Sequence, residues 1–389
     1  MKIEFVLILL RLYTESFFFW IYLTKKKFYK LKTKLNLLPY IIQNCFNTSK
    51  FLNFFNLNYS LNKTFSIMKK ILLLSLVTLI FISCETKEEP KEYSIAGVAV
   101  SNPAFSTLES AAIYGGVVGT LSNANAGDPS GKFTVFAPTN AAFSRLGLNG
   151  ANDLLVLNQT FLTNTLLYHV GNGAKPFASF MIGTTYGSAL GINRKFISRG
   201  ADTFVNGSKI VIKDVGATNG TVHAIDKVML ATGVDIAQST IALTQSKVFT
   251  SPELTFLLEA VLYCNLAGAL SSPNGPYTVY APNDEAFKKL GVILGVPLNK
   301  PSDIRTLPVA TVTQVLLTHV FAGEKFTSEL NGGNVTALNG QMVTLGAYNE
   351  GILTVKGAGN GTNVANMVIP DVKCSNGIVH IIDRVLLPN

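Results

Sequence analysis

Charged side chains, cysteine, histidine and tryptophan are all scarce in this sequence of 389 residues. Charged residues make up 14% of it, and there are four cysteines, four histidines and one tryptophan. So few cysteines exclude a disulfide-rich scaffold, and no two of them have the short spacing of a zinc site. The sequence also lacks a nucleophile elbow, a zinc-protease motif and a paired-carboxylate motif. It therefore indicates no catalytic residue, no metal and no cofactor, and predicts that the protein is not an enzyme.

The positive net charge comes from one end of the chain. Residues 1–83 hold 12 of the 32 Lys and Arg but only 2 of the 23 Asp and Glu, which leaves 20 basic against 21 acidic residues from Cys84 onward. A nearly neutral remainder has no basic patch to neutralise phosphates, so the sequence predicts no nucleic-acid partner.

The second half of the chain repeats the first half in three separate boxes. The boxes are GKFTVFAPTNAAFSRLGL (131–148) with GPYTVYAPNDEAFKKLGV (275–292), LLYHV (166–170) with LLTHV (316–320), and DVGATNGTVHAIDKVML (214–230) with DVKCSNGIVHIIDRVLL (371–387). The offsets between the pairs, 144, 150 and 157 residues, grow slowly and keep the order of the boxes. A unit of about 150 residues has the size of a single domain, so each copy is expected to bury its own core.

An export signal precedes the repeats. Met68 is followed by two lysines, an apolar run over residues 71–82, Ser83 and then Cys84. This segment resembles the signal of bacterial lipoproteins, with residues 68–83 as the signal peptide and Cys84 as the lipid-bearing N-terminus. The apolar run is shorter than the roughly 20 residues that span a bilayer, which leaves a retained membrane helix as the alternative.

Two further segments flank this signal. The preferred interpretation of residues 1–67 is an over-extended start, with translation beginning at Met68; the alternative is a disordered or helical leader that forms an extra anchor. Arg11 and Glu15 interrupt the most apolar part of the leader and make it a poor spanning helix. Residues 84–93 are charged and almost free of aliphatics, which predicts a flexible tether.

Each repeat is predicted to begin with helices and to end with strands. Apolar spacing predicts short helices over 102–121, broken at Gly115-Gly116, and over 251–270. Aromatic and β-branched residues at 133–136 and 277–280 predict strands, each stopped by Ala-Pro. Thr139 or Asn140, and Asn283 or Asp284, can cap the helices that follow.

The later part of each repeat is predicted to be a sheet. Asn-Gly turns between β-rich runs predict hairpins. Strands are expected over 203–215, 221–228, 353–355, 364–369 and 378–385, after a helix near 161–167. The fold class is therefore α+β.

The first and third boxes resemble the two signatures of the fasciclin domain, and they do so in both repeats. The resemblance implies two tandem fasciclin-like domains, each a β-sheet wedge with several helices, over residues 94–232 and 233–389. It also implies a surface-attached protein of adhesion type.

The resemblance assigns two kinds of residue. The Tyr-His pair of animal members implies Tyr168, His169 and His319 as candidate partner-binding residues, although the second repeat has Thr318 in place of the tyrosine. The other signature residues are expected to be structural. They are Thr134, Pro138, Phe143, His223, Asp226, Thr278, Pro282, Phe287, His380 and Asp383.

Two chemical alternatives remain open at this point. His223 and Asp226 lie three apart in a strand and so point to opposite faces, which favours a hydrogen-bonded structural histidine over a catalytic pair. Cys264 and Cys374 could form a disulfide or remain two separate small core-like residues.

The sequence thus predicts a surface-anchored adhesion or matrix-binding lipoprotein with two fasciclin-like domains. Its lipid, a palmitate-type acyl group, would hold it in the outer membrane of the cell envelope, with a protein, a polysaccharide or another cell as the partner. The alternatives are a structural spacer or assembly component and, third, an enzyme or small-ligand carrier. The oligomeric state and the leaflet are left undetermined.

Overall fold

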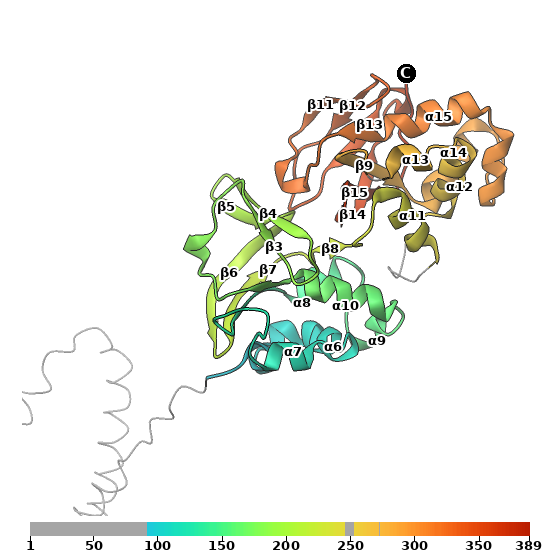
Figure 1. The fold of residues 1–389 in the computed structure, drawn as a ribbon. Coiled ribbons are helices and arrows are strands. Elements are labelled where there is room, and N and C mark those ends of the chain that lie inside the picture. The colour runs from blue at the N-terminus through green and yellow to red at the C-terminus, as the bar shows by residue number, and fades with distance from the viewer. Residues whose placement is uncertain (1–91, 246–252, 272) are drawn as a thin grey trace, which may run out of the picture. The chain divides into compact units, whose positions relative to one another are not determined.

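The computed structural model describes residues 92–245, 253–271 and 273–389. The signal, Cys84 and the leader lie outside this range, as do all but the last two residues of the expected tether. Both repeats belong to one compact unit, Pro90–Asn389 (Figure 1).

The first repeat places its helices mainly before its strands, as the sequence predicts. Its helices are α5 (Ile95–Ser101), η2 (Pro103–Phe105), α6 (Ser106–Tyr114), α7 (Val118–Ser122), α8 (Asn140–Ser144), α9 (Ala151–Leu154), α10 (Gln159–Tyr168) and η3 (Phe177–Ser179). Its strands are β1 (Phe133–Pro138), β2 (Val170–Asn172), β3 (Thr185–Gly187), β4 (Asn193–Arg199), β5 (Asp202–Val205), β6 (Ser208–Ala217) and β7 (Gly220–Ile225).

The second repeat follows the same order after a two-residue strand, β8 (Leu230–Ala231). Its helices are α11 (Ile236–Gln245), α12 (Thr255–Tyr263), α13 (Ala267–Leu270), α14 (Asp284–Leu294), η4 (Pro301–Thr306), α15 (Val309–Thr318), η5 (Thr327–Glu329) and η6 (Ala358–Asn360). Its strands are β9 (Tyr277–Pro282), β10 (Val320–Ala322), β11 (Gly333–Thr336), β12 (Met342–Leu345), β13 (Thr354–Gly357), β14 (Ala365–Cys374) and β15 (Gly377–Ile382).

The two sheets have the same strand order. The first is β2-β1-β7-β6-β5-β4-β3, and the second is β10-β9-β15-β14-β13-β12-β11. In each sheet the aromatic strand pairs in parallel with the strand of the third box, β1 with β7 and β9 with β15, and the other neighbours in these orders are antiparallel. The α+β tandem that the sequence predicts is thereby confirmed.

The strands of the first and third boxes are mostly apolar because both of their faces are covered. All six residues of β1 and all six of β15 are buried. On one face of β1 the helices contribute Leu108, Phe143 and Leu166 to an apolar cluster. On the other face Phe136 packs with Phe196 of the same curved sheet. The signature thus encodes the centre of the core.

The helix caps are largely as predicted. Thr139 accepts the Ala142 N–H at the start of α8, and Asn283 accepts the Ala286 N–H at the start of α14. Asp284 instead caps a different helix, because its carboxylate accepts the Phe256 N–H and the Thr255 hydroxyl proton near the start of α12. The first two residues of the helix predicted over 251–270 lie outside the described residues.

Candidate functional site

The Tyr-His pair of the first repeat is buried where α10 meets β2. Tyr168 is 0% and His169 2% exposed. The Tyr168 hydroxyl donates to Asn193 O at 3.2 Å and accepts from Asn206 Nδ2 at 2.8 Å. Burial raises the pKa of Tyr168 well above its usual value. This tyrosine is part of the core.

The two histidines of the second box make the same pair of backbone hydrogen bonds. His169 Nδ1 lies 2.7 Å from Thr165 O, and its Nε2 accepts the Met229 N–H at 3.0 Å. His319 Nδ1 lies 2.7 Å from Val315 O, and its Nε2 accepts the Leu386 N–H at 2.8 Å. Each ring therefore ties the end of its helix to the segment after the last strand.

These positions correct the prediction that Tyr168, His169 and His319 contact a partner. All three side chains are at most 2% exposed, and Thr318, which replaces the tyrosine, is also buried. The sequence of two residues at a helix end does not show whether their side chains point to solvent or to the core. Here both side chains point into the domain. These side chains stabilise the domain core and do not form a contact surface.

Replacing both Tyr168 and His169 by alanine is therefore expected to unfold the first repeat. Removing a buried aromatic side chain costs about 3–5 kcal/mol, and the Met229 N–H would lose its acceptor. Far-ultraviolet circular dichroism and urea unfolding measure the effect. A variant as stable as the wild type would show that the pair lies on the surface after all.

The third-box histidines, in the inner strands β7 and β15, are also bonded to two backbone groups each, but as the other tautomer. His223 Nδ1 accepts the Asp214 N–H and its Nε2 lies 3.1 Å from Lys175 O. His380 does the same with Asp371 N–H and Lys325 O. With one acceptor and one donor nitrogen fixed by the backbone, each ring is neutral and has no free nitrogen for catalysis.

The remaining signature residues also bind within the fold. Thr134 Oγ1 donates to Gly173 O and accepts the Lys175 N–H, and Thr278 repeats this with Gly323 O and Lys325 N. Asp226 accepts the Lys209 N–H, and Asp383 accepts the Asn366 N–H, both at 2.7 Å. Phe143 and Phe287 lie in the helical cores, and Pro138 and Pro282 end the central strands.

Asp214 and Asp371 occupy equivalent bends but have different surroundings. Both have a left-handed backbone, with φ of 58° and 65°. The Asp214 side chain is 48% exposed and accepts the Phe177 N–H. The Asp371 side chain is 11% exposed and lies against the first repeat. Both residues begin the third box, and their sequence context does not distinguish the exposed side chain from the buried one.

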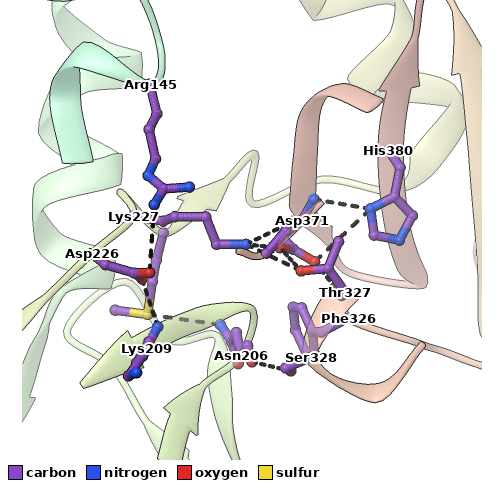
Figure 2. Close-up of polar contacts among 12 residues, drawn as sticks. Arg145, Asn206, Lys209, Asp226, Lys227, Phe326, Thr327, Ser328, Asp371 and His380 are labelled. Atoms are coloured by element: carbon purple, nitrogen blue, oxygen red, sulfur yellow. Dashed lines mark hydrogen bonds and ion pairs between the residues drawn. The ribbon is translucent and has the colours of Figure 1, made fainter. Parts of the chain in front are cut away.

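Lys227 crosses from the first repeat to Asp371 (Figure 2). Its ammonium group donates to Asp371 Oδ2 at 2.8 Å, to Gly351 O at 3.0 Å and to Thr327 Oγ1 at 3.1 Å. The Lys227 side chain is only 9% exposed. All three protons of a buried ammonium group thus have acceptors, which is the condition for burying such a charge.

Other polar contacts surround this ion pair. Lys195 Nζ pairs with Glu329 at 2.6 Å, and Arg199 donates to Ser328 O and Leu330 O. The Ser328 hydroxyl donates to Asn206 O at 2.6 Å (Figure 2). Most of these donors belong to the first repeat and most of the acceptors to the second. The surface that each repeat presents to the other is therefore chemically different.

A strand and an apolar cluster complete the junction. β8, at the end of the first repeat, pairs in parallel with β14 of the second through Leu230–Val372 and Ala231–Lys373. Ile197 and Phe204 of the first repeat pack with Phe326 and Tyr348 of the second. Gly207 has no room for a side chain, because a Cβ there would collide with the Asp371 carboxylate. The repeats are therefore joined by backbone, apolar and ionic contacts together.

The electrostatics of the junction favour an ionised Asp371. Burial alone would raise the pKa of this carboxyl group, but the Lys227 ammonium and the hydrogen bonds from Lys227 and Thr327 bring it below its usual value. The pKa of Asp226 shifts in the opposite direction. Its side chain is 23% exposed, and burial raises its pKa despite the hydrogen bond from the Lys209 N–H. Asp371 is the counter-ion that the buried lysine requires.

Within the described ranges, no group of three or more His, Cys, Asp and Glu side chains could hold a metal ion. Cys264 and Cys374 are free thiols, so the alternative of a disulfide between them is wrong. Burial raises the pKa of the Cys374 thiol, which makes it a poor nucleophile. None of the helices of the described part combines the length and apolar character that crossing a bilayer requires.

The sequence of each repeat matches the family model of the fasciclin domain, over residues 103–231 and 252–388. The chain belongs to the fasciclin domain family. Its two matches coincide with the two sheets described above. Within each matched range the signature residues form the core, and the third boxes also contain Lys227 and Asp371 of the junction.

Several proteins contain similar fasciclin domains. Human periostin is 27% identical over 294 residues, which cover 71% of this chain and 32% of periostin. The immunogenic protein MPB70 of Mycobacterium bovis is 34% identical over 142 residues, 35% of this chain and 68% of that protein. A solved FAS1 domain pair from the insect cell adhesion molecule fasciclin I covers 66% of this chain and 88% of its own, with 17% identity and a TM-score of 0.33. The chain thus spans about a third of the length of periostin.

Proposed function

We propose that this fasciclin tandem is a surface-anchored adhesion or matrix-binding lipoprotein. Cys84 would carry the lipid that holds it in the outer membrane, and the residues up to Tyr93 would serve as the tether. The Lys227–Asp371 junction supports a tandem that is presented to its partner as one rigid unit. The buried, fully bonded histidines support a binding role over a catalytic one.

One exposed apolar segment carries the proposal. At the end of α14 three consecutive aliphatic residues, Val292, Ile293 and Leu294, are 84%, 53% and 47% exposed. At the position that corresponds to Val292 the first repeat has Leu148, which is buried. Adjacent exposed aliphatic side chains are typical of a surface that binds another protein. We assign this segment, the α14 tip, as the contact surface, and a protein as its partner.

A bead-retention assay tests this function. Beads coated with the chain through its N-terminal end are passed over cells that make the protein, and over matrix proteins and polysaccharides. Retention above that of uncoated beads is expected on at least one protein-bearing surface. Replacing Val292, Ile293 and Leu294 together by serine should reduce it at least tenfold, because the apolar contact is lost.

The matched control replaces Leu155 and Val156, two exposed aliphatics of the first repeat, by serine. This variant should be retained like the wild type. Equal loss in both variants, or unchanged retention of the α14 variant, would exclude the α14 tip as the contact surface. Absence of retention on every surface would contradict an adhesive role altogether.

A further inference from the structure

Each repeat contains an apolar pocket at the same place in the fold. In the first repeat a pocket of ≈ 100 Å³ lies between α5, α6 and β1, with His169 among its lining residues. In the second a pocket of ≈ 60 Å³ lies between α11, α12 and β9, with His319 among its lining residues. We propose that these two pockets bind the end of an uncharged alkyl chain, such as that of a lipid or an aliphatic alcohol.

The pockets are built from corresponding residues. Ile95 and Ile236 contribute from the covering helices, Leu108 and Leu257 from the next helices, and Val135 and Val279 from the central strands. The two histidines of the linings, His169 and His319, also correspond to each other. Well-packed cores keep few voids. The same void in two diverged sequences therefore indicates a built feature, more than an accident of packing.

The covering helices are anchored in the same way at one end. The Ile95 N–H donates to Asn219 Oδ1, and the Ile236 N–H donates to Asn376 Oδ1, both at 2.9 Å. At the C-terminus of α5 the Asn102 side chain caps the following helix, η2. Both covering helices are thus held over the pocket through the backbone of their first residue.

The chemistry of the lining selects an alkyl chain over water. Each lining includes one histidine ring, and both nitrogens of that ring are already bonded to the backbone. The Thr240 hydroxyl, in the second pocket, donates to Ile236 O. A buried water needs two to four polar partners, whereas a dry cavity of about 150 Å³ can hold benzene. A ligand here is therefore held by apolar contact alone.

Partly exposed aliphatic side chains of the first pocket connect its apolar lining to the surface. Val100, Ile113 and Val118 line the pocket and are 62%, 64% and 36% exposed. Glu109 is the acidic residue among the lining residues. A carboxylate at this position disfavours an anionic headgroup, so an alcohol should bind better than a fatty acid of the same length. The pocket holds the chain end while these aliphatics contact the next methylenes.

Residue size explains the difference in volume and provides the variants. Ala112 of the first pocket corresponds to Val261 of the second, and Ala99 to Thr240. Ala112→Leu should fill the first pocket, and Ala112→Val should reduce it to the size of the second. Val261→Ala should enlarge the second. Ser110→Leu adds the same bulk to the same helix at a position outside the pocket, and serves as the matched control.

The test is a titration of the full chain with 1-hexanol and with hexanoate, followed by methyl-resolved NMR. Saturable shifts are expected for the methyl groups of Leu108 and Val135, and for those of Leu257 and Val279. Hexanoate should bind the first pocket at least threefold more weakly than hexanol. Ala112→Leu should weaken binding to the first pocket at least tenfold and leave the second unchanged, and Ser110→Leu should change neither.

Other results would overturn the proposal. One is the absence of saturable shifts at these methyls in the folded wild type. Another is a response of the first pocket that persists in Ala112→Leu, or shifts that are as large at the exposed methyls of Val292 as in the pockets. If Ala112→Leu fails to fold, the milder Ala112→Val and Val261→Ala pair decides, because affinity must fall in one and rise in the other. The outcome does not depend on the bead-retention assay, which probes a different surface.

Discussion

Acidification from pH 6.5 to pH 4 is expected to lower the free energy of unfolding by about 3 kcal/mol for each of His169 and His319. Burial lowers the pKa of both rings from 6.5 to about 4. One pKa unit corresponds to about 1.4 kcal/mol, so each histidine contributes roughly this amount. The two together would remove much of the 5–15 kcal/mol that stabilises a typical domain.

The sign follows from the hydrogen bonds. Protonation would place an N–H on Nε2, where each ring now accepts a backbone N–H, from Met229 or from Leu386. The unfolded chain binds these protons near pH 6.5, while the folded chain resists them until about pH 4. Stability is therefore full above pH 6.5, falls as the pH drops through this window and levels off below it.

The two third-box histidines contribute to the same loss, whereas Asp371 and Asp226 do not. Burial also lowers the pKa of His223 and His380, and they add to the loss with the same sign. The pKa of Asp371 lies below its usual value of about 3.9, so its contribution is lost only at lower pH. The raised pKa of Asp226 acts with the opposite sign, because the folded state then holds the proton more tightly.

Urea unfolding at pH 7, 5.5 and 4.5 measures the effect, and ¹⁵N NMR of the rings checks its cause. The spectra should show the Nδ1–H tautomer for His169 and His319, and the Nε2–H tautomer for His223 and His380. A stability that stays constant from pH 7 to pH 4.5 would contradict the buried, neutral histidines.

Replacing Asp371 by asparagine is expected to destabilise the tandem by about 3–5 kcal/mol. The substitution leaves the Lys227 ammonium group buried, with two acceptors and no counter-ion. Asparagine keeps the size of the side chain and tolerates the left-handed backbone. The loss thus reports the missing charge, and urea unfolding at pH 7 measures it.

The first repeat supplies the control. Asp214→Asn changes the corresponding residue, which has nearly the same φ but a half-exposed side chain. Its cost is expected to stay within about 0.5 kcal/mol, as for most surface substitutions. Equal effects of the two substitutions would mean that the bend matters and the ion pair across the junction does not.

The sequence was sufficient for those features that depend on local pattern. The aromatic strands, the Gly115-Gly116 break and the Thr139 and Asn283 caps each follow from residues within one short segment. The repeated boxes identified the family because their order and spacing recur. The α5 and α11 covering helices were not predicted, although Ser94 accepts the Gly97 N–H as an ordinary cap residue would.

The features that the sequence did not provide depend on contacts distant along the chain. Lys227 and Asp371 are 144 residues apart, and nothing in either box distinguishes a lysine at a junction from Arg384 at the same place in the second repeat. The burial of Tyr168 depends on Asn193, at the start of β4, and on Asn206, in the turn between β5 and β6. Such residues are recognised only when the sheet brings these segments together.

Retention of living cells under flow tests the central claim, a fasciclin tandem that acts at the cell surface from a lipid anchor, most directly. Cells that lack the chain are compared with cells in which it is restored as wild type or as Cys84→Ser, on a surface that retains the coated beads. Restoration with the wild type should return retention, while Cys84→Ser should leave the chain out of the membrane fraction and retention low. Equal retention of all three kinds of cell would contradict the account.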